Sequence, residues 1–143
     1  MTAKIGTIDI ETAPLEGHVW GLFDQNVGLN QIKTEWSILS YCFKPLGGSK
    51  RSLVYEDNST AADPRDDRKL LDGLWSILHE YDFLVAQNGK RFDMRKIRAR
   101  MVLAGMRPPS PVKGLDTMLM ARQVGAFTSN KLEWLSQYLS TVP

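Results

Sequence analysis

The sequence predicts an α/β fold in which a mixed sheet is covered by helices. The first part of the chain contains a strand followed by a hairpin, and beyond residue 63 helical segments alternate with short apolar strands. Such alternation is typical of helices packed against a sheet that includes parallel strands. The 143 residues contain no internal repeat and no linker, so we expect residues 1–143 to form a single domain.

Three strands are predicted in the first part of the chain. Residues 4–11 alternate apolar and polar side chains, and a Gly- and Asn-rich stretch then continues to about residue 36, a length that usually indicates a functional or partner-covered loop. The apolar run "WSILSYCFKP" (36–45) is predicted to be a buried strand. A turn at "GG" joins it to its hairpin partner, "RSLVYED" (51–57).

A helix and a strand are predicted next. Asp63 followed by Pro64 is typical of an N-cap and a first helical residue. Leucine and aromatic residues then recur at helical spacing, which predicts a helix to about residue 80. The apolar run "DFLVAQN" (82–88) predicts a short strand that ends in polar residues.

Three further helices are predicted towards the C-terminus. The stretch "FDMRKIRARMVLAGMRPP" (92–109) has a helical apolar stripe, with Asp93 as its N-cap and Gly105 as a residue that can end it. After the short segment "VKGLDT", a helix is predicted from Thr117, with Asp116 as its N-cap. The stretch "NKLEWLSQYL" (130–139) predicts one last amphipathic helix.

The composition indicates a cytosolic protein. Its apolar and charged fractions exclude a disordered or fibrous chain. The single cysteine, Cys42, cannot form an internal disulfide and suits a reducing compartment. No signal peptide opens the sequence, and no apolar run is long enough to cross a bilayer. We therefore expect a cytoplasmic protein with no membrane partner, in the host cytoplasm if a phage encodes it.

Basic residues gather in one block of the second half, although the net charge is only +2. Asp93 is the only acid between residues 90 and 113. Such a block indicates either a solvated helix face or a surface that follows nucleic-acid phosphates. Its members are Lys90, Arg91, Arg95, Lys96, Arg98, Arg100, Arg107 and Lys113.

Two carboxylates share one face of the first predicted strand, and a third begins a helix. Asp9 and Glu11 are two residues apart, so their side chains point the same way and repel each other. Together with Asp93 they could hold Mg²⁺ or Mn²⁺, which bind carboxylates and substrate phosphates, as one or two ions. The alternatives are a solvated strand face for Asp9 and Glu11 and a helix cap for Asp93.

Two segments give the chain a resemblance to a known superfamily. "DIET" (9–12) followed by "VAQNGKRFD" (85–93) resembles the first two motifs of the DEDD, or DnaQ-like, 3′→5′ exonucleases. The chain is most similar to phage and bacterial members related to the exonuclease domain of family B DNA polymerases. The resemblance implies a ribonuclease H-like fold, a role in DNA replication and repair, and hydrolysis of nucleic-acid ends with Mg²⁺ or Mn²⁺ in a two-metal site.

The resemblance also implies roles for individual residues. Asp9 would bind both metals, Glu11 would hold one metal and orient the attacking water, and Asp93 would bind the second metal. Six further residues would contact the substrate, with core packing as the alternative for Phe92. These are Thr12 and Leu15 after the first motif, and Asn88, Lys90, Arg91 and Phe92 in the second.

The third motif of the superfamily is absent from this chain. That motif is Tyr-x-x-x-Asp or His-x-x-x-x-Asp on a C-terminal helix, and it supplies the fourth carboxylate and the residue that positions the water. Here no Asp follows Asp116, and Glu133 is the only later acid. The chain is then a truncated or split exonuclease domain, a chain whose site is completed by a second copy or another subunit, or a relative that does not cut.

The leading functional hypothesis is a metal-dependent 3′→5′ exonuclease that acts on single-stranded DNA ends, with RNA as an open alternative substrate. The competing hypothesis is a non-catalytic module that binds nucleic acid or takes part in replisome assembly and retains the exonuclease fold. The carboxylates favour the first hypothesis, whereas the absent motif and the basic block favour the second.

Overall fold

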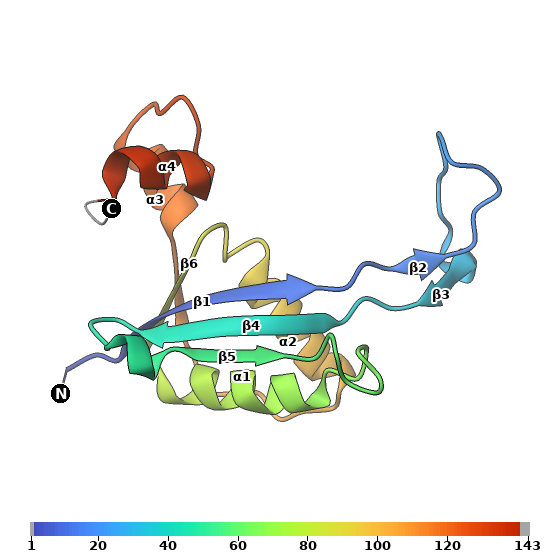
Figure 1. The fold of residues 1–143 in the computed structure, drawn as a ribbon, viewed down its shortest axis with the longest axis horizontal. Helices are drawn as coiled ribbons and strands as arrows, with labels where there is room; N and C mark the ends of the chain where they lie inside the picture. The colour runs from blue at the N-terminus through green and yellow to red at the C-terminus, as the bar shows by residue number, and fades with distance from the viewer. Residues whose placement is uncertain (1, 141–143) are drawn as a thin grey trace.

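The computed structural model describes residues 2–140 and contains a five-stranded mixed sheet with the strand order β5-β4-β1-β6-β7 (Figure 1). The β5-β4-β1 strands pair antiparallel, and the β1-β6-β7 strands pair parallel. The predicted α/β class is confirmed, and this sheet is consistent with the ribonuclease H-like fold. The strands are β1 (Ile5–Thr12), β4 (Ile38–Pro45), β5 (Val54–Asp57), β6 (Phe83–Ala86) and β7 (Lys113–Asp116).

Two helices cover one face of the sheet, and two lie on the other side (Figure 1). The first pair packs its leucines and methionines against inward residues of β1, β4 and β6 to form the main core. The second pair follows the end of β7. The helices are α1 (Arg68–Glu80) and α2 (Asp93–Leu103) on the covered face, and α3 (Thr117–Val124) and α4 (Leu132–Leu139) on the other.

The alternation along β1 separates the core from an open face. Ile8 and Ile10 are buried beneath α1 and α2, whereas Thr7, Asp9 and Glu11 are exposed on the opposite face. Their shared face was predicted from the two-residue period of a strand and is confirmed. The sheet is therefore covered by the α1–α2 pair on one side only, at the level of these residues.

Helix α1 begins later than the sequence predicts. Asp63 and Pro64 form a turn instead, in which the Asp63 carboxylate accepts a hydrogen bond from the Arg65 N–H at 3.0 Å. The buried side chain of Asn58 donates to the carbonyls of residues 63, 64 and 66, so this segment is held away from helical geometry. The helix starts at Arg68, directly after Asp67.

A buried ion pair joins α1, α2 and β4. The Asp67 carboxylate accepts hydrogen bonds from the Ile38 N–H at 2.9 Å and from the Arg100 guanidinium at 2.7 and 2.8 Å. Asp67 is only 3% exposed, so its charge depends on these donors for compensation. A close contact between the Gly73 backbone and the Tyr41 ring adds to the packing of α1 on β4.

Residues 13–35, which we call the arm, project from the end of β1 (Figure 1). The sequence predicted an irregular stretch here, but the arm contains a two-stranded ribbon and a short 3-10 turn. The predicted hairpin partner of β4 also begins with a 3-10 turn. These elements are β2 (Glu16–Gly17), β3 (Ile32–Thr34), η1 (Leu29–Gln31) and η2 (Lys50–Ser52).

Within residues 2–140, no helix has the length and apolar character needed to span a membrane.

Candidate functional site

The three parallel strands bring most of the predicted site residues to one edge of the sheet. β1, β6 and β7 run in the same direction, so their carboxyl ends lie together, the usual position of ligand sites in sheets of this kind. Asp9 and Glu11 lie near the end of β1, Asn88 follows β6, and Asp116 ends β7.

Asp93 lies at this edge because β6 is short. β6 pairs only with residues 5–7 of β1, so β1 continues past its neighbour. There the Asp93 carboxylate accepts a hydrogen bond from the Ile10 N–H at 3.2 Å. Asp93 is the first residue of α2 and Phe92 occupies the N-cap position, so the prediction that Asp93 caps the helix is wrong. Its carboxylate joins α2 to the backbone of β1 instead.

The environment of Asp93 favours its protonated form. The side chain is 2% exposed, and burial raises its pKa to about 6, against the opposing effect of the backbone N–H groups of Asp93 and Ile10. The negative charges of Asp9 and Asp116 raise the pKa further. Asp9 and Asp93 therefore form a repulsive pair that a cation would stabilise.

Asp9 borders a hollow on the open face of the sheet. The hollow has a volume of about 380 Å³ and is lined by Thr7, Asp9, Cys42 and Lys44 of the sheet, with Leu132 of α4 on its far side. Across residues 2–140, no group of three or more His, Cys, Asp or Glu side chains lies close enough together to hold a metal ion. Glu11 is thus on the same face as Asp9 but does not complete a three-carboxylate cluster with Asp93.

The turn between β6 and α2 is held by one buried carboxylate. Asp116 accepts hydrogen bonds from the backbone N–H groups of Asn88 and Lys90, both at 3.1 Å. It also accepts from Met118 and Leu119, which confirms it as the N-cap of α3. The contact of Asp116 with the turn was not predicted from the sequence, because only the β6–β7 pairing brings these segments together.

Asn88 has a left-handed backbone conformation, and its side-chain oxygen lacks a hydrogen-bond partner. Its φ of 59° lies in the left-handed region that Asn tolerates better than most residues. Its side-chain oxygen is buried and has no hydrogen-bond partner among the described residues. Next to it, Gln87 accepts a hydrogen bond from the Thr117 hydroxyl at 2.5 Å and donates to the Asn130 carbonyl at 2.7 Å. Neither Gln87 nor Thr117 was predicted as part of the site.

The other predicted substrate residues differ in exposure. Thr12 is half-buried at a bulge in β1, and Leu15 is exposed at the base of the arm. Lys90 and Arg91 are exposed in the turn before α2, and Phe92 is 38% exposed there and lies outside the main core.

The basic block does not form one continuous surface. Arg100 is bound to Asp67, and Lys113 lies 5.6 Å from the centre of the Phe83 ring at the far end of β6. Lys96 is near the site, with its amino group 3.7 Å from the centre of the Trp36 ring and 5.8 Å from that of Phe92. The turn residues and Lys96 therefore make up the part of the block that lies beside Asp93.

Comparisons with known proteins do not assign this chain to a family. No protein-family model matches the sequence, and no curated protein matches it. Solved structures with a similar fold include the family B DNA polymerase of the hyperthermophilic archaeon Pyrobaculum calidifontis, with 18% sequence identity and a TM-score of 0.49. The match covers 74% of this chain and only 12% of the polymerase. Similarity at this level does not assign the chain to a family or to an activity.

Proposed function

We propose that this chain is a metal-dependent 3′→5′ exonuclease-type domain that hydrolyses phosphodiester bonds at single-stranded DNA ends. The observation that carries the proposal is the position of Asp93. Its buried carboxylate is fixed to the Ile10 N–H, and its pKa is raised chiefly by burial and further by the charges of Asp9 and Asp116. A buried carboxylate with a raised pKa beside an exposed one at the carboxyl edge of a sheet is typical of functional sites, and a cation would relieve the repulsion between the two.

The donors fit a small hard cation. Mg²⁺ in phosphoryl-transfer sites is commonly held by one or two carboxylates together with substrate phosphates, and Asp9 and Asp93 supply such a pair. Glu11, on the same face as Asp9, would join when substrate is present. When bound, Mg²⁺ or Mn²⁺ would polarise the phosphate and make a bound water more acidic.

The residues around the pair fit the end of a nucleic acid strand. Lys90 and Arg91 are exposed beside Asp93 and can neutralise phosphates. Phe92 presents an aromatic ring for stacking against a base, close to the Lys96 amino group. The side-chain oxygen of Asn88 is buried without a hydrogen-bond partner, so a sugar or base would reach it only after the turn moves.

Asp116 is a further carboxylate near this pair, but it already accepts hydrogen bonds from four backbone N–H groups of the turn and of α3. Glu133, the only acid after Asp116, is exposed on α4 and, within residues 2–140, belongs to no group of side chains that could hold a metal ion. We infer that full activity requires a further acid and a water-positioning group from a second chain, whether another copy or a different subunit. General base catalysis contributes roughly 10²- to 10⁴-fold, so the chain alone should retain at most weak activity.

A nuclease assay with matched variants tests the proposal. The purified chain with Mn²⁺ should release mononucleotides from the 3′ end of a labelled single strand, and Asp9→Ala and Asp93→Asn should abolish the release. Asp72→Asn is the matched control because Asp72 is an exposed carboxylate on α1 and should leave the rate unchanged. Release that is equal in all three variants, or no release even at high enzyme concentration, would refute catalysis by this chain alone.

The second candidate is a non-catalytic nucleic-acid-binding or replisome-assembly module, favoured by the exposed basic residues beside the turn. It predicts that Asp9→Ala keeps its affinity for a single-stranded oligonucleotide, while Lys90→Glu with Arg91→Glu loses it. Binding should also weaken steeply with salt, because phosphate contacts release counterions. Fluorescence anisotropy at several salt concentrations measures both effects, and salt-independent binding would rule this candidate out.

A further inference from the structure

The arm presents large apolar side chains to water at its tip, which we define as residues 18–29. Trp20 is 97% exposed, Leu22 90% and Phe23 83%, and Val27 and Leu29 are exposed as well. Exposed apolar residues that occur singly need no explanation, but six within twelve residues of one projection, Val19 included, indicate a binding surface. The tip lies at the far end of the arm, which extends from the carboxyl end of β1 (Figure 1).

The base of the arm is held in place, so the tip is presented in a defined way. The Gln31 side chain donates to the His18 carbonyl at 2.8 Å and accepts from the Gly28 N–H at 2.8 Å, which closes the ribbon below the tip. Arg65 donates to the carbonyls of Pro14 and Glu35 at 3.2 and 3.0 Å and so fixes both sides of the base. A preorganised surface loses less entropy when it binds.

The charge of the tip favours a protein partner over nucleic acid. Asp24 is its only charged residue when His18 is neutral, and no Lys or Arg occurs from residue 13 to residue 32. Surfaces that bind single strands combine aromatic residues with a positively charged groove. The tip has the aromatic residues without the positive charge, and it is therefore suited to an apolar protein groove with a basic rim.

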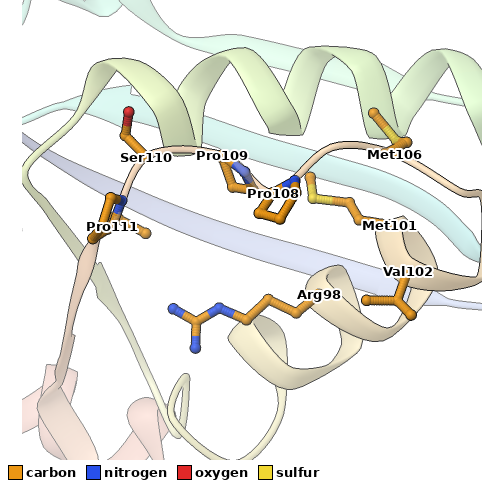
Figure 2. Close-up of a pocket in the computed structure, with 9 residues that line it drawn as sticks. Arg98, Met101, Val102, Met106, Pro108, Pro109, Ser110 and Pro111 are labelled. Carbon is orange, nitrogen blue, oxygen red and sulfur yellow. The ribbon is translucent and has the colours of Figure 1, made fainter.

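The same chain contains a groove of that kind. Figure 2 shows it between the second half of α2 and the segment 106–112, lined by Met101, Val102 and several prolines, with Arg98 at its side. Its volume is about 260 Å³, enough to accept an aromatic side chain. The sequence from residue 94 to residue 115 contains no Asp or Glu. The lining of the groove is thus apolar with Arg98 as its one charged residue, and the acids Glu80 and Asp82 lie in the neighbouring hollow beyond Pro111 and Val112.

We propose that the arm tip of one copy of this chain binds the groove between α2 and residues 106–112 of a second copy. Trp20 or Phe23 fills the groove, and Asp24 faces Arg98 on its α2 side. Aromatic residues in well-packed pockets provide most of the affinity of such contacts. Two copies that exchange arms reciprocally form a closed dimer, whereas a one-way contact forms a ring or a chain. This self-association does not depend on the proposed nuclease activity.

Sedimentation velocity over a concentration series tests the proposal with surface variants. Trp20→Ala removes an exposed ring from the tip, and Val102→Asp places a charge in the exposed wall of the groove. Each should raise the dissociation constant for self-association by roughly tenfold or more. Leu46→Ser, an exposed apolar residue in the β4–β5 connection, is the matched control and should leave association unchanged. Circular dichroism and the melting temperature should show that all variants are folded.

Mixing the two defective variants distinguishes this contact from other kinds of association. The Trp20→Ala chain retains its groove and the Val102→Asp chain retains its arm, so a mixture should form a mixed complex although neither variant associates alone. A wild-type chain that stays monomeric up to its solubility limit would overturn the proposal. So would a Val102→Asp chain that associates normally, or a Trp20→Ala change that weakens binding of a single-stranded oligonucleotide instead of self-association.

Discussion

Replacing Asp93 by Asn should make the protein more stable at alkaline pH and less dependent on pH. The amide is nearly the same size as the carboxyl and can keep the hydrogen bond from the Ile10 N–H, so the local packing is preserved. What the substitution removes is the buried negative charge and its repulsion by Asp9 and Asp116.

The size and sign of the effect follow from the pKa of Asp93. It is about 6 in the folded protein and 3.8 as the ordinary value, so between these pH values the native state binds more protons than the unfolded state. The free energy of unfolding therefore falls as the pH rises through this window. Above the window, the contribution of Asp93 to this free energy no longer changes with pH. About two pKa units correspond to at most about 3 kcal/mol. Solvent near the open edge of the sheet screens part of this penalty, and we expect about 1–2 kcal/mol.

Urea unfolding of the wild type and Asp93→Asn, without metal, measures this difference. The variant should gain about 1–2 kcal/mol relative to wild type between about pH 4 and about pH 8, and nearly all of this gain should arise between about pH 4 and about pH 6. Asp72→Asn, at an exposed position on α1, serves as the control and should show no such gain. A stability difference that is the same at both ends of the pH range would refute the raised pKa and, with it, the electrostatic account of the site.

Three further predictions concern the site and the core. Mg²⁺ should raise the melting temperature of the wild type at about pH 8 but not that of Asp9→Asn, and chelation should reverse the rise. Arg100→Met should cost about 3–5 kcal/mol in urea unfolding by leaving Asp67 unpaired, and Asp67→Asn in the same chain should recover part of this loss. Gly73→Ala should cost about 1–3 kcal/mol because its Cβ would overlap the Tyr41 hydroxyl, and Tyr41→Phe should relieve the overlap.

The elements with a strong local pattern were predictable from the sequence. The two-residue period of β1 identified the core face of Ile8 and Ile10 and the shared face of Asp9 and Glu11, whereas the exposure of Asp9 and Glu11 was only the alternative interpretation. The spacing of the leucines identified α1, and Gly105 has the positive φ of 65° expected after a helix. These features depend on residues close together in the chain, which is why the pattern was sufficient.

The features that depend on distant residues were not predictable. The residues next to Asp93 in the sequence predict a helix cap. Its hydrogen-bond donor, the Ile10 N–H, is 83 residues away and is available only because β6 is short. Asp63 shows a real N-terminal signal, yet Asn58 holds that segment in a turn. The third carboxylate, Glu11, was expected to join Asp9 and Asp93 in a metal site, and whether it does so with metal and substrate bound stays a prediction.

The one-sided covering of β1 has a consequence for mutational scanning. Because alternate residues of the same strand face the core and the open surface, a scan from residue 5 to residue 12 should give two interleaved profiles. Substitutions at Ile8 and Ile10 should lower abundance and melting temperature, whereas those at Asp9 and Glu11 should leave the fold intact and alter only what the protein binds. Within these eight consecutive positions, alternate residues thus report separately the mutational effects on stability and the mutational effects on binding or catalysis.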